Sequence, residues 1–593
     1  MPSLDEIFQL LRNLSPVALR ALRTGQLFRP ACRLMPADPD LVCDFDVKVP
    51  VSDGFELTAS VFRSKARAAR GEAMPVVMCA HPYDNRLVPY LGKTPLGGPP
   101  QQYRMIPQEG KPEFSVATSW EAPDPNFWLS KGYAVVNLNL PGYASSGGPP
   151  SVFSEQQGKA FYDAIEWVGA QPWCTGAIGL NGVSFLAISQ YHVAACRAYG
   201  QAPPSLKAIS PWEGVADITR DLFAPGGVRE TGFPIFWWFT EVKPVLAGDV
   251  EDFVAAEGGT PLEWHDQHPV YDDWAEAKQP DLEAIELPTL LCATFSDQGV
   301  HNPGAFKAFM RIGSNQKWLY THRRLKWDAY YSREVQELTC DFFDCFVKGE
   351  RENGFASRPP VRLEVRASRD EIVEVREEEA WPLPTTRYDR FYLDLNSAAL
   401  VASPPTASSE ASYDARRGHL VFRHAFESDT EVTGHMVLRL FVEARAGKSP
   451  EPAPDDLVLC AVLDKCDTNG RRVRFYGSVG NKNDGVSRGF ARVAARDIDE
   501  VRSTPWLPFL PLRQEQRLAP GEVAEVAMEI CPSSTLFRSG ESLELTIGGH
   551  EIRPSPPFRK DVSDNRGIHV IHTSAEHPSH LLVPVIPAQG ASG

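Results

Sequence analysis

Short apolar runs rich in β-branched residues recur through the first 350 residues, and helical stretches separate them. The runs are residues 75–80, 133–138, 177–180, 290–295 and 317–320. Apolar residues at helical spacing between Phe161 and Val168 mark one of the separating helices. Continuous apolar strands joined by helices are typical of a parallel sheet that is covered on both faces. The sequence therefore predicts an α/β fold up to residue 350.

The pattern changes along the chain, and 593 residues are more than one hydrophobic core usually organises. We predict an N-terminal helical extension (1–41), an α/β core in two parts (42–211 and 288–350), a helical cap inserted between them (212–287) and a C-terminal all-β domain (351–590). Leu4, Ile7, Phe8 and Leu11 give the extension its helical spacing. The last region alternates like strands between Pro, Gly and Asn turns, which indicates a β sandwich or jelly roll.

Composition excludes several classes of partner. The formal net charge of -16 argues against nucleic acid, since binding to phosphates needs clustered Lys and Arg. The N-terminal residues contain no apolar run long enough for a signal peptide or membrane helix. We expect a cytoplasmic protein with a small-molecule substrate and no membrane or nucleic-acid partner. A homo-oligomer is compatible with the sequence.

The 11 cysteines are scattered singly, without a C-x-x-C pair, which indicates reduced, mostly buried side chains. The sequence also lacks H-E-x-x-H and any other close group of metal-ligating residues. We predict no metal and no cofactor.

Ser184 stands where an apolar strand runs through small residues into a helix expected over about 185–199. A serine at such a turn presents its hydroxyl above the sheet, and Gly182 allows the close approach that the turn needs. The G-x-S-x-G pattern is incomplete, because Leu186 occupies the place of the last glycine. Serine is also common at helix starts as a cap, so the motif alone does not decide for a nucleophile.

A nucleophilic serine needs a base and an orienting carboxylate, which follow it in the order Ser, Asp, His in α/β hydrolases. Asp297 follows the run 290–295, and His322 follows the run 317–320. Both residue types therefore occur in the right order at strand ends. We predict Asp297 as the carboxylate and His322 as the base.

Alternatives to this assignment remain. Asp297 can serve only to begin the turn before Gly299, and His322 can be a surface loop residue. His301 is the rival base, although it stands only four residues after Asp297. His81 precedes the serine in the chain.

The oxyanion of an acyl-transfer intermediate needs hydrogen-bond donors. The amide of Phe185 is one candidate. The phenol of Tyr83, in the turn after the run 75–80, is another, with packing against Pro82 as its alternative role.

These motifs together resemble the cocaine esterase, X-Pro dipeptidyl-peptidase and α-amino-acid ester hydrolase family, over about residues 42–585. The resemblance rests on short motifs: H-P-Y-D at 81–84, E-W at 166–167, Q-P-W at 171–173, G-V-S-F-L at 182–186, D-Q-G at 297–299, F-F-D-C-F-V-K-G at 342–349 and W-P at 381–382. It implies a Ser-His-Asp hydrolase with a helical cap and a C-terminal jelly roll. The roles fall on Ser184, Asp297 and His322, with Tyr83 and the Phe185 amide as the oxyanion donors.

The sequence departs from the family pattern at Phe185, where Tyr is usual, at Ala187, where Gly is usual, and at residues 140–142. The expected substrate is an ester or amide, and Glu213 is a candidate to receive a substrate ammonium group. The aromatic stretch 233–239 either lines an acyl pocket or forms the core of the cap. Two other functions remain open, a catalytically silent binding protein that uses the jelly roll and an acyltransferase with the same acyl-enzyme.

Overall fold

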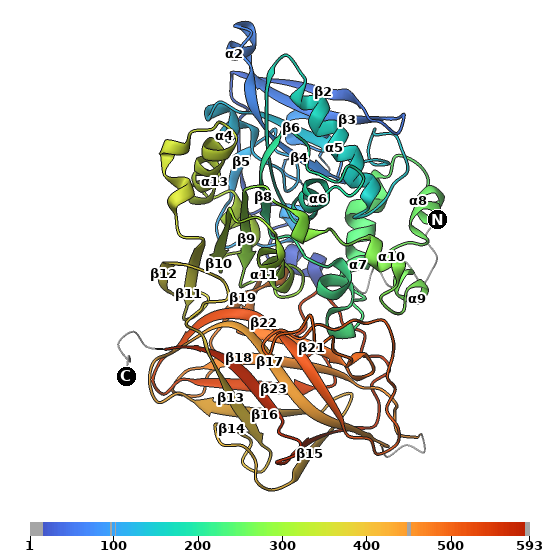
Figure 1. Ribbon diagram of the computed structural model, residues 1–593, viewed down its shortest axis with the longest axis vertical. Helices are drawn as coiled ribbons and strands as arrows, with labels where there is room; N and C mark the ends of the chain where they lie inside the picture. The colour runs from blue at the N-terminus through green and yellow to red at the C-terminus, as the bar shows by residue number, and fades with distance from the viewer. Residues whose placement is uncertain (1–15, 95–97, 101, 448–451, 588–593) are drawn as a thin grey trace.

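The computed structural model describes residues 16–94, 98–100, 102–447 and 452–587. The helix expected around Leu4 to Leu11 lies outside these residues. Figure 1 shows an α/β half stacked on a β-rich half, with the strand labels of the second half gathered at one end. The expected α/β fold followed by β structure is therefore observed.

One mixed sheet forms the α/β half. Its strands lie in the order β2 (Leu41–Pro50), β3 (Glu56–Ser64), β6 (Ala134–Asn139), β4 (Met74–His81), β7 (Cys174–Val183), β8 (Leu206–Trp212), β9 (Thr289–Thr294), β10 (Lys317–His322), β11 (Val361–Arg366) and β12 (Ile372–Glu378). The strands from β6 to β11 are parallel, so their carboxyl ends share one edge of the sheet.

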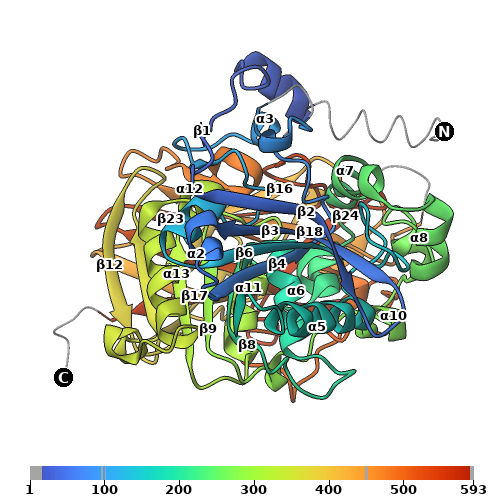
Figure 2. The ribbon, with the colours of Figure 1, turned by 90° about the horizontal axis from the view of Figure 1, so that it is seen from above.

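Helices cover both faces of this sheet because its strands are apolar on both sides. On β4, Val76 and Met78 join one hydrophobic core and Val77 joins another, as the period of two requires. The first core includes residues of α5 (Glu155–Gly169), α6 (Phe185–Ala194) and α11 (Asn302–Arg311). The second includes residues of α4 (Pro125–Ser130) and α13 (Arg333–Phe346). Figure 2 shows α5 and α6 together beside the strands, seen from above.

The named elements between β8 and β9 in the described chain are helical, where the sequence predicts a cap. They are η2 (Ile218–Phe223), η3 (Pro225–Gly227), α7 (Phe233–Trp237), η4 (Trp238–Val242), η5 (Lys243–Val245), α8 (Val250–Glu257), α9 (Trp264–Gln267), α10 (Asp273–Ala277) and η6 (Leu282–Ala284). Short helices α2 (Lys65–Ala69), η1 (Pro89–Leu91) and α3 (Gln102–Met105), with the small sheet of β1 (Arg33–Met35) and β5 (Glu113–Ser115), lie in the first half.

The second half is β-rich and mostly antiparallel. Its strands are β13 (Arg387–Asp394), β14 (Ala399–Val401), β15 (Ser409–Asp414), β16 (His419–Ala425), β17 (Thr430–Arg445), β18 (Val458–Cys466), β19 (Phe475–Gly477), β20 (Asn481–Asp484), β21 (Ser487–Arg492), β22 (Ala524–Phe537), β23 (Ser542–Gly548), β24 (Ile568–Thr573) and β25 (His580–Ile586). The long strand β17 pairs with β22 along one edge and with β24 and β25 along the other. Strand β23 lies between β16 and β18.

Two boundaries differ from the expected ones. Helix α6 ends at Ala194 rather than near residue 199, since Ala195 leaves helical geometry with φ -112° and ψ 40°. The α/β sheet also continues through β11 and β12, so the expected boundary at residue 350 falls before its last two strands.

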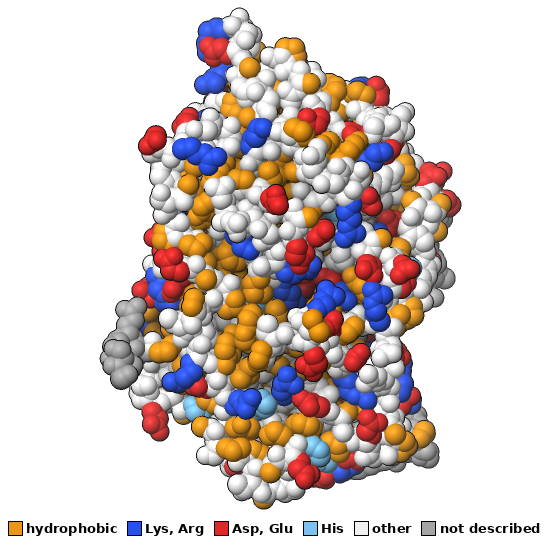
Figure 3. Space-filling model, viewed as in Figure 1, with side chains coloured by type: hydrophobic (Ala, Val, Ile, Leu, Met, Phe, Trp, Pro, Cys, Tyr) orange, Lys and Arg blue, Asp and Glu red, His pale blue; other side chains and the backbone are white. Residues whose placement is uncertain are grey.

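Other features of the chain bear on its partners. No helix among the described residues is long and apolar enough to cross a membrane. The cysteines are all free, and all except Cys32 and Cys43 are buried. On the face drawn in Figure 3, Lys and Arg side chains lie among Asp and Glu rather than in one basic patch.

Candidate active site

Ser184 occupies a strained turn between β7 and α6. Its φ of 61° and ψ of -115° are unusual for a residue other than glycine, and they are held because the Ser184 amide donates to the carbonyl of Trp212 at 3.0 Å. The turn places Ser184 at the carboxyl edge of the sheet and at the N-terminus of α6. This arrangement is that of a nucleophile elbow.

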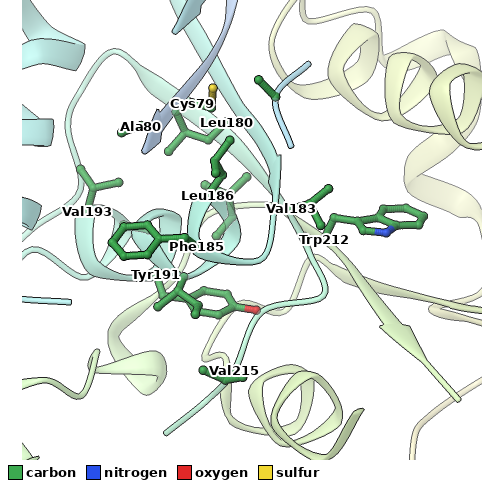
Figure 4. Packing of buried hydrophobic residues seen from close by; sticks show 14 of the residues in the cluster. Cys79, Ala80, Leu180, Val183, Phe185, Leu186, Tyr191, Val193, Trp212 and Val215 are labelled. Carbon is green, nitrogen blue, oxygen red and sulfur yellow. The ribbon is translucent and has the colours of Figure 1, made fainter. Parts of the chain in front are cut away.

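Glycine at position 182 makes the turn sterically possible. A Cβ added there would lie 2.5 Å from the Cβ of Leu186, well inside contact distance. Figure 4 shows Leu186 among the apolar side chains of the neighbouring strands, including Leu180 and Ala80. Leu186 therefore fills the core below the elbow, and the motif does not need a glycine at that position.

The imidazole that contacts Ser184 belongs to His301. The Ser184 hydroxyl lies 2.9 Å from His301 Nε2, and His301 Nδ1 lies 2.7 Å from Asp297 Oδ2. With the proton on Nδ1 donated to Asp297, Nε2 is free to accept the serine proton. Ser184 and Asp297, both predicted site residues, are thus joined by His301, the rival base, rather than by His322.

The expectation that His322 lies on Ser184 is corrected. His322 is the last residue of β10, and its Nε2 contacts Glu213 Oε1 at 3.0 Å. Its ring stacks on Trp212 with centroids 5.7 Å apart, and the side chain is buried. His322 is therefore neither the partner of Ser184 nor a surface loop residue.

Local geometry explains how a histidine only four residues after Asp297 reaches the serine. The amides of His301 and Asn302 donate to the Asp297 carbonyl at 3.1 and 2.9 Å, which folds the loop back before α11 begins at Asn302. Residues four apart on a helical turn lie on one face. The spacing of four residues between 297 and 301 is the sequence signal for this arrangement, whereas the prediction of His322 follows from the positions of strand ends.

A cation completes the group. Lys326, the first residue of α12 (Lys326–Tyr330), places Nζ 3.2 Å from Asp297 Oδ2 and 3.0 Å from His301 Nδ1. It also lies 3.9 Å from Glu213 Oε2. Lys326 is not among the predicted site residues, because nothing in its local sequence pattern distinguishes it from a surface lysine.

These contacts set the protonation states of the site. Burial alone would raise the pKa of the Asp297 carboxyl, but the charge of Lys326 and the bond from His301 hold that pKa well below its ordinary value. Burial lowers the pKa of His301, and the charge of Lys326 lowers it further. His301 is therefore neutral and Asp297 ionised at neutral pH, as a general base and its orienting carboxylate require.

Tyr83 and Phe185 lie at the same cavity as Ser184. The Phe185 amide is the first of α6, so it has no partner within the helix. Burial raises the pKa of the Tyr83 phenol well above its ordinary value, and the charges of Glu241 and Glu121 raise it further. The phenol therefore keeps its proton and can donate. The Tyr83 and Phe185 rings meet edge to face at 6.1 Å.

Aromatic side chains from the core, the cap and the β-rich half enclose the cavity. They include Trp120, Phe153, Phe236, Trp237 and Phe558. Phe153 stacks on Phe185 with centroids 4.3 Å apart. In the aromatic stretch 233–239, Trp237 lines the cavity, whereas Trp238 is buried and packs on Phe253 with ring centroids 4.8 Å apart. That stretch therefore serves both as a wall and as cap core.

Two carboxyls of the cavity are Glu121 and Glu241. Burial raises the pKa of Glu121 well above its ordinary value and raises that of Glu241 to about 7. Glu213, the candidate for a substrate ammonium, is fully buried against His322 and is absent from the cavity wall. The structure therefore gives Glu213 no access to a substrate.

Among the residues that the structure describes, three groups of side chains are close enough to share an ion. They are Glu213 with Asp297 and His301, Glu213 with Cys292 and His322, and Glu410 with Glu443 and His572. The Lys326 ammonium lies against the first group, and Arg445 pairs with both carboxylates of the third. Burial raises the pKa of the Cys292 thiol well above its ordinary value, which makes it a poor ligand in the second. A metal fits none of these groups well.

The sequence matches known families over most of its length. Residues 53–325 match the X-Pro dipeptidyl-peptidase (S15) family, and residues 353–582 match the X-Pro dipeptidyl-peptidase C-terminal non-catalytic domain. Cocaine esterase from Rhodococcus sp. (strain MB1 Bresler) is 24% identical over 621 aligned positions, which cover 91% of this chain and 98% of that protein.

Solved structures share the fold. A CocE/NonD family hydrolase from Staphylococcus aureus, with a crystal structure at 1.95 Å, has a TM-score of 0.81 and 32% identity, covering 92% of this chain and 94% of that one. An α-amino acid ester hydrolase has a TM-score of 0.66 at 15% identity, over 93% and 97% of the two chains. The second likeness concerns the fold alone.

Proposed function

Because the chain belongs to the family of the CocE/NonD hydrolases and is a hydrolytic enzyme, we propose that it cleaves ester or amide bonds through an acyl-enzyme on Ser184. The observation that carries the proposal is the continuous contact from Ser184 Oγ through His301 to Asp297, at 2.9 and 2.7 Å. A serine hydroxyl becomes a useful nucleophile only beside such a base.

In the first step Ser184 Oγ attacks the substrate carbonyl carbon while its proton passes to His301 Nε2. The carbonyl π electrons move onto oxygen, and the Phe185 amide and Tyr83 phenol donate to that oxyanion. The intermediate collapses, the bond to the leaving alcohol or amine breaks, and His301 returns the proton to that group. The acyl chain remains as an ester of Ser184.

In the second step water takes the place of the leaving group. His301 accepts a proton from the water, whose oxygen attacks the acyl carbon, and a second oxyanion forms at the same donors. Collapse breaks the bond to Ser184 Oγ, which recovers its proton from His301. Asp297 remains ionised throughout and stabilises the imidazolium in both steps.

The walls favour an apolar acyl or leaving group. Flat rings face the reacting serine from several sides, and an aromatic group can stack against Phe185 or Trp237. Few charged groups reach the same space, and the raised pKa values of Glu121 and Glu241 reduce their negative charge. We therefore propose aryl and alkyl esters ahead of charged peptides.

We also propose that the β-rich half is a jelly roll. Antiparallel pairing of β17 on both edges and the central place of β23 between β16 and β18 support two facing sheets. Phe558 and the turn 478–480 bring this half to the cavity.

A screen of aryl esters, amino-acid esters and dipeptidyl amides with the wild-type protein and S184A tests the proposal. We expect turnover of aryl esters by the wild type, stable labelling of Ser184 by a fluorophosphonate, and loss of both in S184A by several orders of magnitude. Equal labelling of S184A would place the nucleophile elsewhere.

A further inference from the structure

The β-rich half sends one hairpin to the candidate active site. Strands β19 and β20 pair as a small separate sheet, and the turn between them is residues 478–480. Figure 1 places β19 at the junction of the two halves. Gly477, Ser478, Val479 and Gly480 line the same cavity as Ser184 and His301. A segment of the second half thus lies within reach of the reacting groups.

The turn of this hairpin is held in an unfavourable conformation. Val479 has φ 51° and ψ 43°, which a β-branched residue rarely adopts and which costs about 1–3 kcal/mol. Arg20 of the N-terminal helical residues donates to the Val479 carbonyl at 3.0 Å. Gly480 approaches Pro107 so closely that an added Cβ would lie 2.5 Å from the Pro107 carbonyl oxygen. Contacts from two separate segments therefore fix the position of Ser478.

Ser478 is buried beside the Asp297 loop. Its hydroxyl oxygen accepts a hydrogen bond from the Gly299 amide at 2.6 Å. The hydroxyl proton needs an acceptor of its own, since a buried donor without a partner is costly. Asp297 Oδ1 is buried and has no hydrogen-bond partner among the described residues. Ser478 and Asp297 line the same cavity, and the bond to Gly299 ties the Ser478 hydroxyl to the Asp297 loop.

We propose that Ser478 is a positioning residue. Its hydroxyl donates a hydrogen bond to Asp297 Oδ1 and so fixes the carboxylate that orients His301. Lys326 and His301 both contact Asp297 Oδ2, and Ser478 supplies the donor to the second carboxylate oxygen, Oδ1. A domain whose family description is non-catalytic thereby completes the site. The inference rests on the proposed function of Ser184, His301 and Asp297.

The test compares S478A with S478T, which keeps the hydroxyl, and with S487A. Ser487 is a matched control, because it is buried in the same half, donates to the Cys531 carbonyl and does not line the cavity. Steady-state kinetics on an aryl ester are measured across pH. We expect S478A to lose about ten- to a hundredfold in kcat with little change in KM, as for one hydrogen bond to a charged group.

We also expect the acid limb of the S478A profile to move to higher pH, because a carboxylate with fewer donors holds the proton on His301 more strongly. S478T should recover most of the activity, and S487A should match the wild type in both readouts. A normal kcat and unchanged acid limb in S478A would overturn the inference while S184A still lost activity. If S184A kept full activity, the proposed function itself would be wrong.

Discussion

The ammonium of Lys326 lies 3.2 Å from Asp297 Oδ2, so the carboxylate that orients His301 is also one member of an ion pair, whose side chains are 13% and 8% exposed. The same ammonium lies 3.0 Å from His301 Nδ1 and opposes protonation of the imidazole. One lysine thus keeps Asp297 ionised and His301 neutral.

Removal of this charge should therefore shift the pH profile. The base acts when it is neutral, and Lys326 lowers the pKa of His301, so K326M should raise that pKa and move the acid limb of kcat/KM to higher pH. K326R keeps the positive charge and should leave the limb nearly in place. The measurement is kcat/KM on an aryl ester from acid to neutral pH. An acid limb that stays or moves to lower pH in K326M would refute this role.

Tyr83 should contribute to the rate far more than to binding. Y83F removes a donor to the oxyanion, and kcat should fall about a hundred- to a thousandfold, or about 3–4 kcal/mol, with little change in KM. Y143F is the matched control, because Tyr143 is buried, donates to the Ser151 carbonyl and lies off the cavity wall. Near-normal turnover of an unactivated ester by Y83F would show that Tyr83 is only a packing residue.

Apolar periodicity predicted the strands that form the centre of the α/β sheet, because strands buried on both faces must be apolar throughout. The order of residues along the chain also placed Ser184 and Asp297 at the correct edge. The same order did not identify the base. A strand end and the first turn of a helix both reach that edge, and the order of residues does not show that the His322 ring contacts Glu213 instead of Ser184.

The contacts between the two halves could not be predicted from the sequence, for a related reason. Ser478 of the β-rich half accepts from the Gly299 amide of the α/β half, although 179 positions separate them in the sequence, and the register of one half on the other depends on packing at the interface. Local patterns predict elements, whereas this packing needs the folded chain.

A buried ion pair joins the cap to the β-rich half and supports the cavity wall. Lys560 Nζ lies 2.8 Å from Glu230 Oε2, and Phe233 stacks on Phe558 nearby at 5.5 Å. K560M leaves the Glu230 carboxylate buried without its cation, which should cost about 3–5 kcal/mol. The midpoint of thermal unfolding should fall clearly.

R513M is the control for this change. Arg513 pairs with Glu276 at the surface, with side-chain exposures of 52% and 56%, where such a pair contributes about 0–1 kcal/mol. Its unfolding midpoint should stay close to that of the wild type. Equal midpoints for K560M and R513M would mean that the Lys560 pair does not hold the halves together.

Chelation should leave activity unchanged. The carboxylate and imidazole of the site already contact the Lys326 ammonium, and the proposed chemistry uses no metal. Esterase activity after incubation with EDTA and gel filtration should equal that of the untreated enzyme. Inactivation that added zinc or manganese reverses would require a different mechanism.

The identity of the base is the central claim, and labelling of Ser184 by a fluorophosphonate tests it without reference to any substrate. The second-order labelling rate should fall by several orders of magnitude in H301Q, because the glutamine amide cannot take up the proton that His301 Nε2, 2.9 Å from the hydroxyl, accepts. In H322Q, whose amide can still donate to Glu213, the rate should remain within a fewfold of the wild type. Slow labelling of H322Q together with normal labelling of H301Q would contradict the account and return the base to His322.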